Sequence, residues 1–222
     1  MDDIRLLVGI PAMNMEVMPR DFFDSVLMMQ KPEGTEVFTK RGHAIDEVRN
    51  AFALQALNGG YTHLLMLDAD MFYPVDTIDR LLKDDVDIVC GLACQRIAPY
   101  DFVCSLTRPA DDEWAVCMAN EAEIPESGTY ETGSVGGAAL LIRTDVFRKM
   151  EYPFFSREQK NRKGETVSED IYFSLKARAI GFQCHTNMNV RIGHLMNVMV
   201  LPVWNAKERR WERVMANTTV KV

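Results

Sequence analysis

Two aspartates one residue apart, Asp68 and Asp70, follow the apolar run 64–67. Side chains at positions i and i+2 of a strand point to the same side, so a buried strand ending here is expected to bring both carboxylates to one spot. Open α/β sheets bind ligands at the carboxyl ends of their strands. Carboxylate oxygens suit Mg2+ or Mn2+, and such an ion suits a diphosphate. The pair predicts a metal and phosphate site, although a strand followed by an acidic turn would show the same pattern.

The composition is that of a soluble protein with one sizeable core. At 222 residues, with 47% hydrophobic and 26% charged residues, we expect a single domain over residues 1–222. No apolar run approaches the ~18 residues needed to span a bilayer, and the acidic start lacks the features of a signal peptide. Five cysteines without a C-x-x-C pair indicate reduced thiols. We therefore expect a cytoplasmic protein with no membrane span.

The net charge of −7 disfavours polyanionic partners. A nucleic-acid role would need a local basic patch, for which 157–163 and 207–213 are the candidates. A solvated loop and a solvated helix face explain both segments more simply. A nucleic-acid acceptor is therefore not expected but stays open, and the oligomeric state is not predicted.

Apolar runs of strand length alternate with helical patterns, which predicts a largely parallel sheet covered by helices. The expected strands are 5–10, 36–39, 63–67, 88–93 and 138–142, with weaker ones at 102–106, 114–118 and 190–193. The expected helices are 19–30, 43–58, 76–83, 144–150 and 168–180. Segment 98–134 is less regular, and we expect short antiparallel strands and loops there on one side of a cleft.

Several short motifs follow one another in a fixed order. They are VGIPAMN at 8–14, DEVRNA at 46–51, DAD at 68–70, TGSVGGAALLIR at 132–143, SEDIYF at 168–173 and GH at 193–194. This ordered set resembles the nucleotide-sugar glycosyltransferases of the GT-A fold, similar to the family 2 enzymes of bacteria and phages. The resemblance covers residues 6 to about 194. The polar segment 183–189 departs from the aromatic-rich strand of the family, and the tail has no match.

The resemblance implies an α/β, Rossmann-like GT-A domain: a mostly parallel central sheet flanked by helices, with a small antiparallel or loop region on the acceptor side. It divides the chain into a nucleotide-binding half at about 1–97, a donor-sugar and acceptor half at about 98–195 and a tail at 196–222. The donor would be a nucleoside-diphosphate sugar. The acceptor would be a hydroxyl of a glycan, a metabolite or another molecule.

The resemblance also implies which residues bind the donor. They are Pro11, Asn14, Arg49, Asn50, Asp68, Gly136 and Gly137. Arg49 would hold the nucleotide or Asp68; the alternative is a surface pair with Asp46 on the same helix. The two glycines would let the backbone approach the sugar, although a plain loop into the next strand also explains them.

Cleavage of a nucleotide sugar leaves charge on the diphosphate, and a divalent cation there stabilises the transition state. Asp70 is the first choice as metal ligand and His194 the second; Asp68 would contact the ribose or reach the ion through water. A histidine among oxygen donors favours Mn2+ over Mg2+. The alternative for His194 is a histidine hydrogen-bonded at the end of a strand.

An acceptor hydroxyl needs a base to remove its proton, and a carboxylate can do this. Asp170 is the candidate catalytic residue, with Glu169 second. Acids in the first turn of a helix are also favoured by the helix dipole. Adjacent residues differ by about 100° around a helix, so only one of the two is expected to face the sugar.

We therefore expect a metal-dependent, inverting glycosyltransferase. Three alternatives stay open: a retaining GT-A enzyme with the same site, a non-catalytic sugar-nucleotide or carbohydrate binder on a decayed transferase fold, and a haloacid-dehalogenase-like phosphatase with Asp68 as nucleophile. The last is disfavoured because its aspartate pair usually lies near the N-terminus, whereas here a strand-helix-strand-helix unit precedes Asp68.

Overall fold

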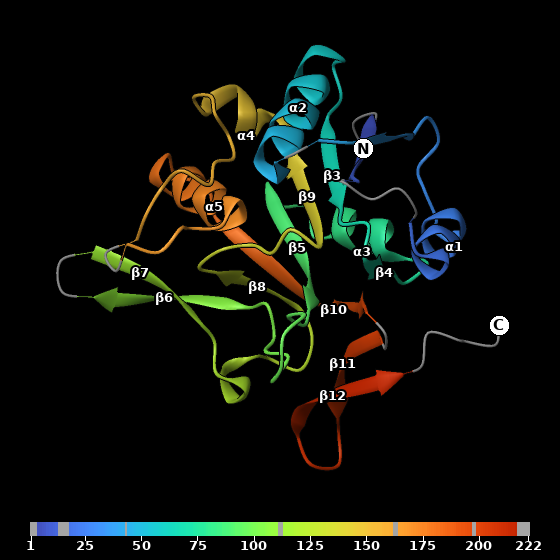
Figure 1. Cartoon of the computed structure of the whole chain (residues 1–222), viewed down its shortest axis with the longest axis vertical. Coiled ribbons are helices and arrows are strands. Elements are labelled where there is room, and N and C mark those ends of the chain that lie inside the picture. The colour runs from blue at the N-terminus through green and yellow to red at the C-terminus, as the bar shows by residue number, and fades with distance from the viewer. Residues whose placement is uncertain are drawn as a thin grey trace.

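A ten-stranded sheet runs through the protein in the order β12-β11-β10-β5-β9-β3-β1-β2, with β4 and β8 also paired to β10 (Figure 1). The computed structural model describes residues 4–12, 18–42, 44–110, 113–161, 164–196 and 199–216. The strands of this sheet are β1 (Leu6–Pro11), β2 (Glu36–Lys40), β3 (His63–Leu67), β4 (Met71–Phe72), β5 (Ile88–Ala93), β8 (Thr129–Thr132), β9 (Ala139–Arg143), β10 (Cys184–Leu195), β11 (Met199–Asn205) and β12 (Arg210–Ala216).

The helices and the hairpin complete the fold. The helices are α1 (Arg20–Met28), α2 (Ile45–Asn58), α3 (Thr77–Lys83), α4 (Thr144–Lys149), α5 (Glu169–Ala179) and the short η1 (Glu121–Glu123). A separate antiparallel hairpin, β6 (Ser105–Ala110) and β7 (Glu113–Met118), extends from the body of the protein (Figure 1). All five predicted helices and the five principal strands are present, each end within two residues of its predicted position.

The expectation of a mostly parallel sheet is confirmed only in part. Strands β2, β1 and β3 are parallel, and so are β5 and β10, but β9 is antiparallel to both β3 and β5. The chain leaves β5 at the carboxyl edge, forms the hairpin and β8, and enters β9 from that same edge. The apolar run at 138–142 identifies a buried strand but carries no information on its direction.

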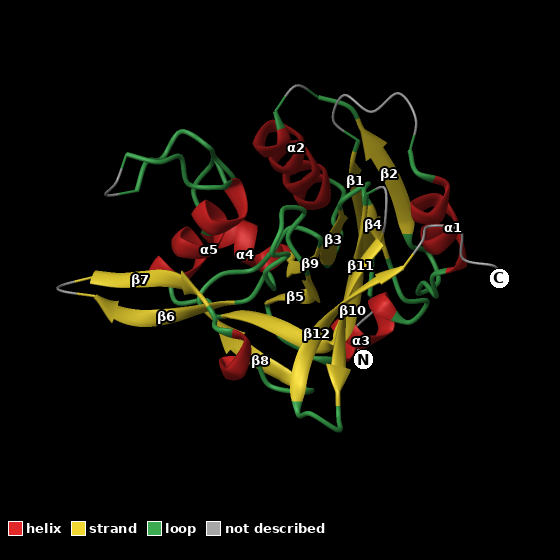
Figure 2. Ribbon diagram, turned by 60° about the horizontal axis from the view of Figure 1, so that its bottom comes forward, coloured by secondary structure: helices red, strands yellow, loops and turns green. Residues whose placement is uncertain are grey.

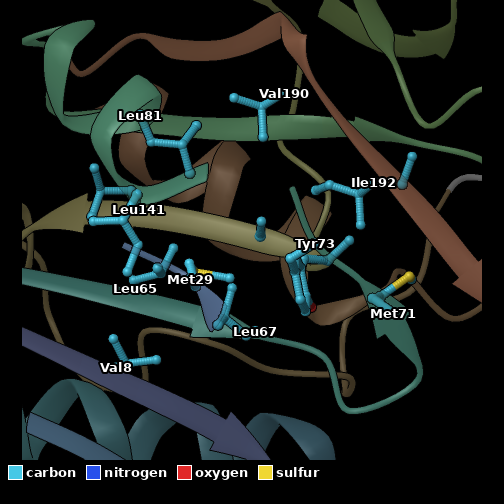
Figure 3. Close-up of a cluster of buried hydrophobic side chains, with 14 of the residues drawn as sticks. Val8, Met29, Leu65, Leu67, Met71, Tyr73, Leu81, Leu141, Val190 and Ile192 are labelled. Carbon is cyan, nitrogen blue, oxygen red and sulfur yellow. The ribbon is translucent and has the colours of Figure 1, made fainter. Parts of the chain in front are cut away.

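Two helical layers cover the sheet (Figure 2). Strand β3 shows how the sequence achieves this: Leu65 and Leu67 pack with α1 and α3, while Leu64 and Met66 pack with α2, α4 and α5. Figure 3 shows the first of these clusters, with Leu65 and Leu67 among its members. A strand buried on both faces is apolar throughout instead of alternating, which explains the continuous run before the aspartate pair.

The last third of the chain extends the sheet beyond what the sequence predicted. Strand β10 begins at Cys184, within the polar segment, because its polar side chains are satisfied in the interior: buried Asn187 donates to Asp84 Oδ2 at 2.7 Å. The tail forms the β11–β12 hairpin, on which Trp204 and Trp211 pack edge to face. Among the described residues no helix is long and apolar enough to cross a membrane.

Candidate active site

The two aspartates lie in a turn at the carboxyl edge of the sheet, immediately after β3. The Asp68 amide donates to the Ala138 carbonyl at 3.1 Å, and the Tyr73 hydroxyl lies 2.8 and 2.6 Å from the carbonyl oxygens of Asp68 and Ala138. On the other side, the Leu195 amide donates to the Asp70 carbonyl at 2.7 Å. The backbone of the turn is therefore held by Ala138, immediately before β9, and by Leu195 of β10.

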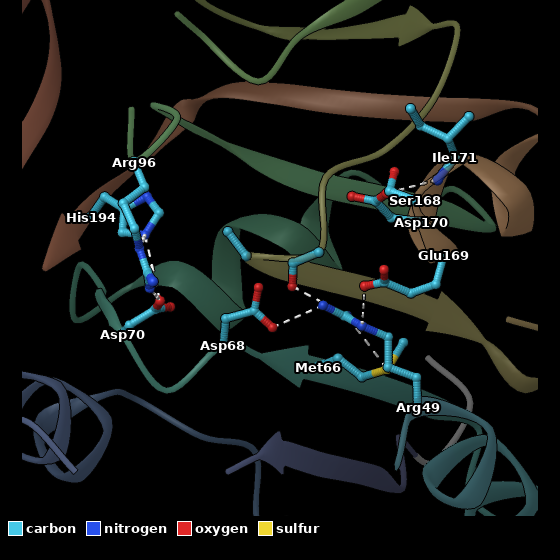
Figure 4. Close-up of polar contacts among 12 residues, drawn as sticks. Arg49, Met66, Asp68, Asp70, Arg96, Ser168, Glu169, Asp170, Ile171 and His194 are labelled. Atoms are coloured by element: carbon cyan, nitrogen blue, oxygen red, sulfur yellow. Dashed lines mark hydrogen bonds and ion pairs between the residues drawn. The ribbon is translucent and has the colours of Figure 1, made fainter. Parts of the chain in front are cut away.

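The two carboxylates have different partners, which corrects the expectation that they meet at one spot. Asp68 binds Arg49, whereas Asp70 contacts Arg96 and His194 (Figure 4). The strand rule does not apply because β3 ends at Leu67 and the aspartates occupy a turn. In the described part of the chain, no three His, Cys, Asp or Glu side chains are grouped closely enough to hold a metal.

Arg49 is a buried cation at the centre of the site, with only 2% of its side chain exposed. Its Nη2 donates to Asp68 Oδ1 at 2.8 Å, its Nε lies 3.1 Å from Glu169 Oε1, and its Nη1 donates to the Gly137 carbonyl at 3.4 Å. The alternative of a surface pair with Asp46 is therefore wrong. Arg49 joins α2, the end of β3, the loop before β9 and the start of α5.

Around Arg49, negatively charged side chains outnumber positively charged ones. Burial raises the pKa of Asp68 and that of Glu169; Arg49 lowers both, and the neighbouring Asp170 charge raises both. Burial lowers the pKa of Arg49, but the carboxylates more than reverse this, so the guanidinium stays charged. Three carboxylates around one cation favour a further positive group beside them.

The two candidate bases have different surroundings. Glu169 is buried and paired with Arg49. Asp170 is partly exposed, and its Oδ1 accepts from the Ile171 amide at 2.8 Å and from the Ser168 hydroxyl. Glu169 thus pairs with Arg49, whereas among the described residues the Asp170 carboxylate is hydrogen-bonded to Ser168 and Ile171 at the start of α5 (Figure 4).

Asp70 and His194 come together at the second half of the site. His194 Nε2 lies 3.5 Å from Asp70 Oδ2, and Nδ1 lies 3.0 Å from the Cys94 carbonyl. A carbonyl only accepts, so Nδ1 carries the proton, and the lone pair of Nε2 accepts a hydrogen bond from Arg96 Nε at 3.3 Å. Burial lowers the pKa of His194, and the nearby Arg96 charge lowers it further, which favours the neutral imidazole. A neutral imidazole oriented by a backbone carbonyl is the form that binds metals.

The remaining predicted binding residues fall at different places. Asn50 is engaged by the loop after α4: its Oδ1 accepts from the amides of Phe154 and Phe155 at 2.9 and 3.0 Å, and its Nδ2 donates to the Phe155 carbonyl at 2.7 Å. The structure therefore gives Asn50 a role in holding this loop. Pro11 ends β1 and is buried, and Asn14 lies outside the described residues.

The glycine pair makes room for neighbouring side chains. A Cβ on Gly137 would stand 2.1 Å from Arg49 Nη2, and one on Gly136 would stand 2.7 Å from Val103 Cγ1. A side chain at 137 would displace the buried Arg49 guanidinium, and one at 136 would push Val103 aside. This explains the G-G pair without contact to a sugar.

Two residues of the site were not predicted from the sequence, Arg96 and Tyr73. Arg96 lies three residues after the end of β5. Because ligands bind at the carboxyl ends of strands, this position could have identified Arg96 as a candidate site residue. Nothing in the sequence pattern distinguishes Tyr73 from a core tyrosine.

Comparison with known proteins gives evidence for the fold. No protein-family model matches the sequence, and no curated protein matches it significantly. A197 from STIV aligns over 99% of this chain and 97% of its own, with a TM-score of 0.60 and 16% identity. GalNAc-T7, solved with UDP, GalNAc and Mn2+, aligns over 88% of this chain and 44% of its own, with a TM-score of 0.55 and 14% identity.

The chain has a glycosyltransferase-like fold. At these identities the likeness establishes the architecture alone. In this fold the aspartate turn, the Arg49 cluster and the Asp70–His194 pair all lie at the carboxyl edge of the sheet.

Proposed function

We propose that this protein is a glycosyltransferase that moves a sugar from a nucleoside-diphosphate sugar to an acceptor hydroxyl with the help of a divalent cation. The observation that carries the proposal is the Asp70–His194 pair, with Oδ2 and Nε2 3.5 Å apart beside Asp68 at the carboxyl edge of a glycosyltransferase-like fold. A carboxylate and a neutral imidazole are a donor set that suits Mn2+ better than Mg2+.

The cation would be held by Asp70 and His194, with the donor phosphates and water completing its coordination. Held there, a cation would stabilise the charge that develops on the diphosphate leaving group. Asp68 is the more distant ligand, acting through water or on the ribose, since Arg49 already binds its Oδ1. The half at about 1–97, with Pro11 at the end of β1, would hold the nucleotide, and about 98–195 the sugar and acceptor.

Asp170 is the proposed base. It is partly exposed at the start of α5, and its Oδ1 accepts hydrogen bonds from Ser168 and Ile171 of its own helix end. A base on the acceptor hydroxyl and a single in-line displacement give inversion at the anomeric carbon. Arg49 is a positioning residue in this scheme, because it holds Asp68 and Glu169 by ion pairs.

The test is release of nucleoside diphosphate from a panel of nucleotide sugars with Mn2+, in wild type and in Asp170→Asn. The expected result is turnover with one donor, lost in Asp170→Asn while donor binding is retained. Inverted product excludes the retaining alternative. Binding without turnover in wild type, against many acceptors, would instead support the non-catalytic binder, and phosphate release from simple phosphomonoesters would support the phosphatase.

A further inference from the structure

The Arg96 guanidinium lies between the two proposed metal ligands. Its Nη2 donates to Asp70 Oδ2 and its Nε donates to His194 Nε2 at 3.3 Å (Figure 4). These are the two atoms that a divalent cation would need. A guanidinium and a cation cannot use the same lone pairs, and their like charges repel.

Arg96 differs from the other cation of the site in its freedom to move. The Arg49 side chain is 2% exposed and fixed by three elements, whereas the Arg96 side chain is 56% exposed. Residues 95–99 around it are exposed as well. Arg96 can therefore leave Asp70 and His194 without disturbing the core.

We propose that Arg96 holds the cation position closed in the free protein, leaves it when a divalent cation binds, and then binds the diphosphate of the donor. This inference rests on the proposed function. In the free protein, Arg96 neutralises Asp70, whose side chain is only 18% exposed. Once displaced, its planar guanidinium offers paired N–H donors that match phosphate oxygens.

The proposal predicts effects of opposite sign for two ligands. Arg96 lowers the apparent affinity for a cation alone, because only the fraction of molecules with Arg96 displaced can bind it. The same residue raises the affinity of the cation-loaded protein for a diphosphate. Replacing a residue with a purely structural role would not raise the affinity for the cation and at the same time lower the affinity for the diphosphate.

The first experiment titrates Mn2+ alone, followed by the loss of the free Mn2+ signal in electron paramagnetic resonance. The variants are Arg96→Gln, Asp70→Asn and the control Arg148→Gln, which removes an arginine of similar exposure, 53%, from a surface pair on α4. The expected result is Mn2+ binding about five-fold or more tighter in Arg96→Gln, unchanged in Arg148→Gln and lost in Asp70→Asn. Unchanged binding in Arg96→Gln with loss in Asp70→Asn would overturn this inference and leave the proposed function intact. Unchanged binding in Asp70→Asn would overturn both.

The second experiment measures inorganic pyrophosphate binding by calorimetry at saturating Mn2+, since pyrophosphate presents the diphosphate without base or sugar. The expected order of affinity is wild type, then Arg96→Lys, which keeps the charge but not the planar fork, then Arg96→Gln. Equal affinity in wild type and Arg96→Gln would overturn the diphosphate role.

Discussion

The guanidinium of Arg49 occupies the space that a side chain at Gly137 would fill: a Cβ there would stand 2.1 Å from Nη2. Gly137 and Arg49 are 88 residues apart in the chain, yet the Gly137 carbonyl also accepts a hydrogen bond from Nη1 at 3.4 Å. The glycine thus lets a buried cation reach both Asp68 and Glu169.

Gly137→Ala is expected to destabilise the protein by about 1–3 kcal/mol, because the buried guanidinium must shift away from its partners. Urea unfolding of Gly137→Ala, Arg49→Ala and the double variant measures this effect. If the clash with Arg49 is the cause, alanine at 137 costs much less in the Arg49→Ala background. An equal cost in both backgrounds would contradict this account of Gly137.

Arg49→Met is expected to cost about 3–5 kcal/mol in the free energy of unfolding, because it leaves Asp68 and Glu169 without their counter-ion. Chemical denaturation provides the measurement. Arg148→Gln, which breaks a surface pair with Asp145, is the matched control and should stay within ~0.5 kcal/mol of wild type. Similar small effects for both variants would show that Arg49 is not the centre of a buried network.

Asn50→Leu is expected to lose about 2–4 kcal/mol of stability, because the amides of Phe154 and Phe155 lose their buried acceptor. Gln55→Ala, on the same helix and partly exposed, serves as control. Nucleotide affinity, measured well below the unfolding temperature, should be similar in wild type and Asn50→Leu. A selective loss of nucleotide affinity with little loss of stability would instead assign Asn50 to the donor site.

His63, at the start of β3, is predicted to make folding sensitive to acid. Burial lowers its pKa from the ordinary 6.5, and the nearby Arg143 charge lowers it further. The unfolded chain therefore takes up a proton first, and this contribution to stability is lost as pH falls through 6.5 and levels off below the folded pKa. From pH 8 to 5, the unfolding free energy of wild type minus that of His63→Gln should be constant above pH 7.5 and should fall as the pH is lowered through 6.5. A pH-independent difference would be evidence against the shift.

The sequence predicted where the strands and helices lie better than it predicted how they pair. Residues 63–67 and 88–93 are apolar throughout because both faces of β3 and β5 are covered, and such runs are easy to locate. The direction of β9 was not predictable, because it depends on how the chain crosses the carboxyl edge after β5. The predicted strand at 190–193 begins later than β10, which starts at Cys184. The first, polar part of β10 was missed because its buried hydrogen bonds to Asp84 and Thr132 join distant segments of the chain.

The same limit applies to the site. Motif order indicated Asp68, Asp70, Asp170 and His194, and the structure places them at one edge of the sheet. Whether those residues bind as proposed remains a prediction. The separate partners of Asp68 and Asp70, and the position of Arg96 between Asp70 and His194, follow from three-dimensional contacts that no local spacing encodes.

The central claim, a cation-dependent nucleotide site at Asp70 and His194, is tested most directly by thermal unfolding with nucleoside diphosphates and their sugars, each with Mn2+, Mg2+ or chelator. A ligand that binds only the folded state raises the unfolding temperature. The account predicts a Mn2+-dependent rise with one nucleotide, abolished in Asp70→Asn and preserved in Asp145→Asn, a surface aspartate on α4. No rise with any nucleotide in wild type, or an equal rise in Asp70→Asn, would contradict it.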